Sequence, residues 1–138
     1  SSLLFFIGIL LSVGALKEIQ ILDKAAMYLF QYIGNDSSFA MHTALYLTGV
    51  FSGVVDNVPL VAALIKMFSE KFVTDHSFWQ MLAYCAGTGG SITIIGSAAG
   101  ISLMGSEGIS FSWYMKNMLF TALISYTAGF FWYVCIIN

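Results

Sequence analysis

Apolar residues dominate the chain in long stretches, and polar residues interrupt these stretches at only a few points. Four stretches are apolar over most of their length: residues 3–16, 40–65, 77–106 and 117–138. Because a helix that crosses a bilayer needs about 20 apolar residues, this pattern predicts an all-α integral membrane protein. The weaker amphipathic segment 19–33 carries Asp23 and Lys24, and we expect short membrane helices or an interfacial arm within 3–34.

Two of the stretches are interrupted in ways that predict broken helices. In the first, Val58 precedes Pro59, and a proline disfavours helix at the residue before it but suits the first turn of a new helix. In the second, three glycines fall within the four residues 87–90, which does not favour a continuous helix. We therefore expect interruptions at 55–59 and at 87–91.

Helix lengths indicate how these segments meet the membrane. As helices, residues 40–55 would rise roughly 24 Å and residues 59–69 roughly 16 Å, which is too short for two full crossings. A re-entrant hairpin over 40–69, with Asp56 and Asn57 at its tip, fits these lengths better. Four charged residues then return the chain to water: Lys66, Glu70, Lys71 and Asp75.

The next elements predict a cavity that both interruptions line. We expect a broken transmembrane helix at 78–105 and a final transmembrane helix at 111–138. Interrupted backbone is stable at membrane depth only where it is buried in protein or lines a polar cavity. Glycine pairs that favour close packing lie on both interrupted elements: Gly49 with Gly53, and Gly96 with Gly100. The alternative, that one or both interruptions are surface turns between short helices, stays open.

The composition supports a membrane protein and excludes other classes. Of the 138 residues, 59% are hydrophobic and 9% are charged, whereas a soluble domain is about half apolar and about a quarter charged. All five basic residues are lysines, and the net charge is −2, so no basic patch is available to bind nucleic acid. A disordered chain, a nucleic-acid binder and an ordinary cytosolic enzyme are thereby excluded.

Three smaller features complete the composition. Cys85 and Cys135 each lie in an apolar stretch, and we interpret them as small buried hydrophobes, not as a disulfide or a metal pair. Aromatic residues near the expected segment ends, Tyr114 and Tyr133 among them, predict anchors at the membrane surface. The chain begins at Ser1 inside an apolar stretch, so we expect it to be a piece of a longer protein.

Asp56 is the most informative residue for function. A carboxylate within an apolar stretch is costly, which makes it a functional-site hypothesis. The same group can hold a proton or a monovalent cation, but not both well, and this competition is sufficient for exchange of one against the other. The structural alternative is that Asp56 caps the helix that begins near Pro59. The two roles are compatible.

Other oxygen atoms could complete a cation site with Asp56. Ser52 lies four residues earlier and faces the same side of a helix, and Asn57 adds a carbonyl oxygen. Four hydroxyl groups lie in the second interrupted element: Thr88, Ser91, Thr93 and Ser97. Hard cations prefer such oxygen ligands. In membrane helices, hydroxyl groups also commonly bond to the backbone or serve packing, and that alternative stays open for each of them.

Two motifs together resemble the NhaD-type sodium/proton antiporters. They are SGVVDNVPLVAA at residues 52–63 and GTGGSITIIGSAAG at residues 87–100. These antiporters belong to the ion transporter superfamily, with the arsenite and citrate/dicarboxylate carriers. The resemblance implies two inverted repeats, each with a re-entrant hairpin and a broken helix. This chain would be the C-terminal repeat, and the N-terminal repeat of the same protein would be its partner.

The resemblance also assigns the cation site. Ser52, Asp56 and Asn57 correspond to the sodium positions at the hairpin tip. Residues 88–91 correspond to the unwound loop that faces the tip, where backbone oxygens contribute. Related carriers have a neutral Ser-Asn pair at the tip, whereas this sequence has Asp-Asn. That difference favours exchange of an ion for a proton over co-transport of an organic anion.

The expected function is secondary antiport of Na⁺ (or Li⁺) against H⁺, without enzymatic activity and without a bound cofactor. The expected location is the plasma membrane of a bacterium, with an organelle inner membrane as the alternative. A homodimer is compatible with the sequence. One alternative function is an anion carrier for arsenite or a di- or tricarboxylate. Another is a membrane subunit that does not transport. An intramembrane aspartyl protease is excluded, because no second acid lies in an apolar stretch.

Overall fold

The computed structural model describes residues 38–137, together with isolated residues between 4 and 31. The membrane or arm helices expected within 3–34 lie outside the described residues. Residues 38–137 form six helices: α3 (Ser38–Ser52), α4 (Asn57–Phe68), α5 (Ser77–Gly89), α6 (Ala98–Glu107), α7 (Phe111–Asn117) and α8 (Leu119–Ile137). No strand occurs in this part of the chain, so the all-α prediction is confirmed for it.

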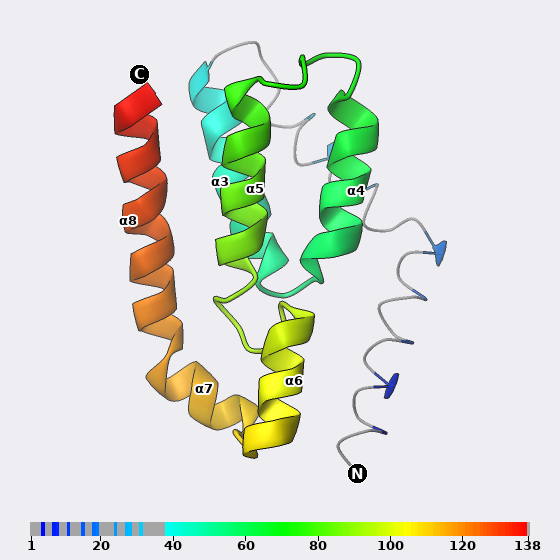
Figure 1. Cartoon of the computed structure of the whole chain (residues 1–138), viewed down its shortest axis with the longest axis vertical. Coiled ribbons are helices and arrows are strands. Elements are labelled where there is room, and N and C mark those ends of the chain that lie inside the picture. The colour runs from blue at the N-terminus through cyan, green and yellow to red at the C-terminus, as the bar shows by residue number, and fades with distance from the viewer. Residues whose placement is uncertain are drawn as a thin grey trace.

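The helices form a bundle with an open lower part (Figure 1). α3 and α5 descend side by side, and α4 returns upward beside α5. α6 continues below α5 after a stretch without helix. The short α7 then leads into α8, which ascends along the other side of α5. The turn between α3 and α4 and the stretch between α5 and α6 therefore lie at the same level.

The first interruption lies where the sequence predicts it, and the second lies later. α3 ends at Ser52 and α4 begins at Asn57. α5 continues through Gly89 and α6 begins at Ala98, so residues 90–97 are unwound, not 87–91. Helical hydrogen bonding continues through the glycines, with the Gly90 amide donating to the Ala86 carbonyl at 3.2 Å. Of these glycines, Gly89 packs closely against Gly49 of α3, and Gly87 and Gly89 remain within the helix.

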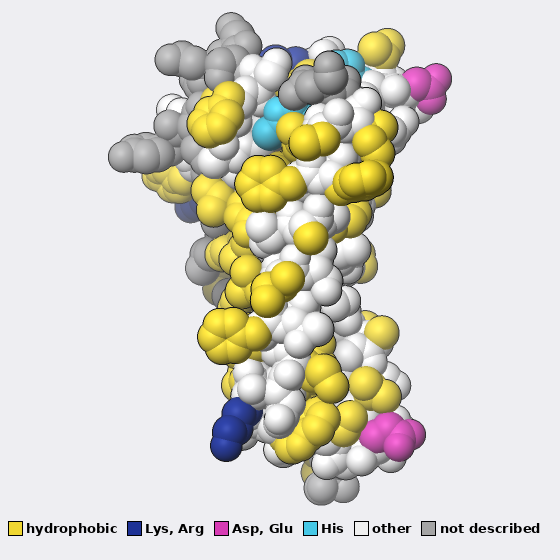
Figure 2. Space-filling view, turned by 90° about the vertical axis from the view of Figure 1, so that its left-hand side faces the viewer, with side chains coloured by type: hydrophobic (Ala, Val, Ile, Leu, Met, Phe, Trp, Pro, Cys, Tyr) yellow, Lys and Arg dark blue, Asp and Glu magenta, His cyan; other side chains and the backbone are white. Residues whose placement is uncertain are grey.

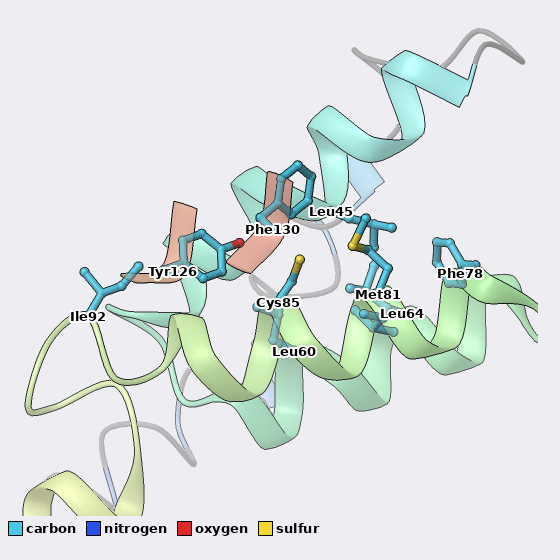
Figure 3. Packing of buried hydrophobic residues seen from close by; sticks show 10 residues of the cluster. Leu45, Leu60, Leu64, Phe78, Met81, Cys85, Ile92, Tyr126 and Phe130 are labelled. Carbon is cyan, nitrogen blue, oxygen red and sulfur yellow. The ribbon is translucent and has the colours of Figure 1, made fainter. Parts of the chain in front are cut away.

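A hydrophobic core lies between α3, α4, α5 and α8 (Figure 3). Its most buried members are Leu45, Leu60, Leu64, Phe78, Met81, Leu82, Cys85, Ile92, Tyr126 and Phe130. The interpretation of Cys85 as a buried hydrophobe is confirmed, but for Cys135 it is wrong because that side chain is exposed. Five residues after Phe130, Cys135 is rotated by roughly 140° around the helix and so lies on the outer face of α8.

The outer face of α8 is apolar and uncovered. Figure 2 shows hydrophobic side chains along this face. The exposed members on α8 are Phe120, Ile124, Phe131, Trp132 and Ile136. Residues 119–136 are long and apolar enough to cross a membrane, and within the described residues they form the one such segment. Soluble proteins rarely expose so continuous an apolar surface, which favours contact of this face with lipid.

Tyrosine side chains attach α8 to the other helices. The Tyr126 hydroxyl donates to the Tyr46 carbonyl of α3 at 2.8 Å, and the Tyr84 hydroxyl of α5 donates to the Tyr126 carbonyl at 2.9 Å. The rings of Tyr46 and Tyr126 stack with centroids 5.2 Å apart. Gly49 and Gly129 leave the space that these hydroxyl groups occupy. α8 is therefore fixed to both α3 and α5.

α3 and α5 cross with backbone against backbone at Gly49 and Gly89. A Cβ atom on Gly89 would lie only 2.7 Å from Gly49 Cα, whereas a Cβ atom on Gly87 would meet nothing within 4 Å. We expect Gly89→Ala to lower the free energy of unfolding by about 1–3 kcal/mol, as overpacking does. Gly87→Ala, the matched control on the same helix, should leave it unchanged or raise it by up to about 1 kcal/mol.

Reversible unfolding of the full-length protein in mixed micelles measures both variants. Equal stability of the two would contradict the close crossing of α3 and α5.

Candidate ion-binding site

Two hydroxyl groups join the end of α3 and the turn after it to α5 and to the second interruption. The Ser52 hydroxyl donates to the Ala86 carbonyl of α5 at 2.9 Å. The Thr93 hydroxyl, from the unwound segment 90–97, donates to the Gly53 carbonyl. Both donors are buried. The second interruption therefore satisfies a backbone carbonyl of the first, as interrupted helices require when water is absent.

Glycines let the two backbones touch. A Cβ atom on Gly53 would lie 3.1 Å from the Gly89 carbonyl oxygen. A Cβ atom on Gly96 would lie 2.7 Å from the Gly53 carbonyl oxygen and 2.8 Å from that of Ser52. A larger residue at Gly96 would require a shift of the backbone, and one at Gly53 would require its neighbours to move by a few tenths of an ångström. The turn between α3 and α4 and segment 90–97 are thus in direct contact, and we call this contact the junction.

Four helix ends converge at the junction. α3 and α5 end there, and α4 and α6 begin there (Figure 1). The last carbonyl groups of a helix lack helical partners and carry partial negative charge, whereas the first amides carry partial positive charge. Carbonyl oxygens at the ends of α3 and α5 are thus concentrated in one place, which is the kind of surrounding a monovalent cation prefers.

Asp56 lies at the edge of the junction as the N-cap of α4. Its Oδ1 atom accepts a hydrogen bond from the Val58 amide at 3.3 Å, and its side chain is half-buried. The capping role is therefore confirmed. The Val58 amide is the one partner found for this carboxylate among the described residues. Three residues of chain reach at most about 11 Å, so Asp56 stays close to Gly53.

The remaining predicted site residues occupy different positions. Asn57 is half-buried as the first residue of α4. Ser97 caps α6, accepting from the Gly100 amide at 3.1 Å. Ser91 has an exposed side chain, but its carbonyl accepts from the Tyr114 hydroxyl at 2.7 Å. Thr88 is exposed and donates to the Tyr84 carbonyl of its own helix. Thr93 is thus brought against the hairpin, whereas Thr88 is not.

The junction offers neutral oxygens and one nearby carboxylate. Within the described residues, no group of three or more His, Cys, Asp or Glu side chains could hold a metal ion. In the same part of the chain, every buried side-chain nitrogen or oxygen has a hydrogen-bond partner. A cation bound here would therefore share oxygens that already accept hydrogen bonds, or replace a bond such as that of Thr93 to Gly53.

The chain is similar to named transporters over most of its length. It is 45% identical over 136 residues to "Sodium/proton antiporter 1" and 43% identical over 136 residues to "Sodium/proton antiporter 2", both from Arabidopsis thaliana, and each alignment covers 98% of this chain. It is 38% identical over 104 residues, 75% of the chain, to "Na(+)/H(+) antiporter NhaD" from Alkalimonas amylolytica. No protein-family profile and no solved structure matches the chain.

These similarities confirm the resemblance stated from the two motifs. The chain is homologous to a segment of the NhaD-type sodium/proton antiporters. It spans 23% and 31% of the lengths of the two plant relatives, and 20% of the length of the bacterial one. The chain therefore corresponds to a fragment of such a protein.

Loss of the Thr93 hydroxyl should lower the free energy of unfolding more than loss of the Thr88 hydroxyl. Thr93→Val leaves the buried Gly53 carbonyl without its donor, which should lower the free energy of unfolding by about 1–3 kcal/mol. Thr88→Val removes a bond within one exposed helical turn and should change it by less than about 0.5 kcal/mol. Unfolding of the two variants in the same micelles measures the difference. A Thr88→Val variant as unstable as Thr93→Val would contradict the junction.

Proposed function

We propose that this chain is part of a multi-pass membrane transporter that exchanges Na⁺ (or Li⁺) for H⁺. The similarity to proteins named sodium/proton antiporters supports the activity. The apolar, uncovered segment 119–136 supports insertion into a membrane. The chain itself would not be an enzyme, because the proposed reaction moves ions and makes no covalent bond. A bacterial plasma membrane and an organelle inner membrane are the two proposed locations.

The observation that carries this proposal is the junction. Two interrupted helices meet there through Gly53 and Gly96, with Asp56 beginning the next helix. Interrupted helices supply carbonyl oxygens that an intact helix would use internally. They are a known means of building sodium sites in transporters. A carboxylate at the same point supplies the negative charge that a monovalent cation requires.

Asp56 is the proposed shared site for Na⁺ and H⁺. One of its oxygen atoms caps α4 through the Val58 amide, and the other can face a cation or take up a proton. The carboxyl group binds Na⁺ as the anion and releases it on protonation, because the neutral acid attracts a cation only weakly. The other ligands that we propose from the sequence are Ser52 and Asn57, the hydroxyls or carbonyls of Thr88, Ser91 and Thr93, and the Ser97 hydroxyl.

The helix lengths support a re-entrant hairpin over α3 and α4. Their 15 and 12 residues rise about 22 Å and 18 Å, which is less than the roughly 30 Å of hydrocarbon in a bilayer. The turn at residues 53–56 would then lie within the membrane. The N-terminal repeat of the same protein would enclose the junction from the other side, and the bilayer would surround both repeats. We also propose that two copies of the full-length protein can form a homodimer.

An anion carrier fits the junction less well. A helix N-terminus can bind an anion, but the first amides of α4 already face the Asp56 carboxylate. A second negative charge at the same helix end would be repelled by this carboxylate. A membrane subunit that does not transport would have no need for four helix ends clustered at the junction. We therefore place cation exchange first.

Asp56→Asn separates ion binding from helix capping. Asparagine caps helices about as well as aspartate, so the variant should fold normally, but it can neither carry the charge nor release the proton. We expect sodium-dependent proton exchange in vesicles containing the full-length protein to fall at least about 100-fold. The melting temperature of the purified variant should differ from that of the wild type by no more than a few degrees.

Asp75→Asn is the matched control. Asp75 lies exposed in the turn between α4 and α5, remote from the junction in sequence, so exchange should remain at the wild-type rate. Retained exchange in Asp56→Asn would remove Asp56 from the mechanism. Exchange driven by arsenite or a dicarboxylate, and not by Na⁺ alone, would favour the anion carrier.

A further inference from the structure

Tyr114 links the C-terminal part of the chain to the unwound segment 90–97. Its hydroxyl donates a hydrogen bond to the Ser91 carbonyl oxygen at 2.7 Å, and its side chain is half-buried. The two residues are 23 positions apart in sequence. The bond therefore closes a loop that contains most of the unwound segment, all of α6 and the beginning of α7.

The two helices of this loop, α6 and α7, have few buried residues. Ile101 is the buried residue of α6, and no residue of α7 is buried. Gly108 ends α6 with a φ of 66°, a left-handed conformation that glycine adopts without strain. The chain can therefore turn back so that α7 leads toward α8 (Figure 1). Segment 90–97 is itself packed through Ile92, Thr93 and Ile94, which are buried. Ser91 beside them is exposed, and its carbonyl accepts from the Tyr114 hydroxyl, so this bond adds to the packing at the exposed start of the segment.

Tyr114 itself is attached to the well-packed part of the bundle. The Met118 amide donates to the Tyr114 carbonyl at 2.8 Å, and the Ala122 amide donates to the Met118 carbonyl at 2.9 Å. Helical bonding thus continues from α7 into α8. α8 is fixed to α3 and α5 by Tyr126 and Tyr84. Tyr114 is therefore connected through Met118 to α8, and α8 is bound to α3 and α5.

We propose that Tyr114 is a positioning residue for the cation site. Its bond to Ser91 holds the unwound segment against the hairpin, where Thr93 donates to the Gly53 carbonyl. This inference rests on the proposed function, because it assigns the unwound segment to the cation site. Without the bond, segment 90–97 occupies the binding geometry for a smaller fraction of the time, and the apparent cation affinity falls by that fraction.

Tyr114→Phe tests the proposal because it removes only the hydroxyl. A single hydrogen bond corresponds to a factor of about five in an equilibrium constant. We therefore expect the apparent KM for Na⁺ to rise about fivefold, with little change in the maximal exchange rate. A loss of folded protein would lower the maximal rate instead. The full-length protein in proteoliposomes is the sample for this measurement.

Tyr133→Phe is the matched control. The Tyr133 hydroxyl also bonds to a neighbouring helix, to Gln80 Oε1 at 3.0 Å, but Gln80 lies in the first turns of α5, at the opposite end of that helix from segment 90–97. This variant should keep the wild-type KM for Na⁺. Hydrogen–deuterium exchange of a peptide that covers 90–97 gives a second measurement, and it should become faster in Tyr114→Phe alone.

The outcomes are distinguishable from failure of the proposed function. A wild-type protein whose proton exchange does not depend on Na⁺ would contradict the proposed function itself. With sodium-dependent exchange in the wild type, an unchanged KM in Tyr114→Phe would overturn the positioning role, even if segment 90–97 exchanged faster. An equal rise of KM in both tyrosine variants would overturn it as well, because the effect would then be independent of Ser91.

Discussion

The structure depends on direct contact between two stretches of interrupted backbone. Hydrocarbon offers no hydrogen bonds, so interrupted helices persist in a membrane only if protein groups replace water. Here Thr93 of the second interruption donates to the Gly53 carbonyl of the first, and Ser52 at the end of α3 donates to the Ala86 carbonyl of α5. Gly96 leaves the space for this contact, because a Cβ atom there would lie 2.7 Å from the Gly53 carbonyl oxygen and 2.8 Å from that of Ser52.

The same contact gives the molecule its proposed chemistry. Helix ends that meet in one place concentrate carbonyl oxygens, and Asp56 adds a carboxylate that also serves as a helix cap. One group can thus contribute to stability and to ion binding. The surrounding helices keep this arrangement in place through side-chain packing and through the tyrosine bonds of α8. Tyr114 extends that support to the unwound segment.

Sequence alone predicts the features that depend on local chemistry. Pro59 locates the first interruption, and the apolar stretches locate the helices. The glycine pairs predict that the hairpin and the broken helix touch. Glycine propensity predicts an interruption at 87–91, but the contact of Gly89 with α3 accompanies a helix that continues through Gly89. Tertiary contact outweighs local propensity there.

Other features could not be predicted because they join residues far apart in the chain. The bond from Tyr114 to Ser91 has no local signal, and a tyrosine near a segment end is equally typical of an anchor at the membrane surface. The exposed position of Cys135 follows from which face of α8 packs inward, and that face is determined by Tyr126 and Phe130.

Proton release on sodium binding tests the central claim most directly, because it reports on competition at a single site without requiring transport. Na⁺ is added to purified full-length protein in weakly buffered detergent solution near the pH at which exchange is half-maximal, and the pH of the solution is recorded. We predict that protons are released in proportion to the Na⁺ bound. Sodium binding with no release of protons would contradict a shared carboxylate.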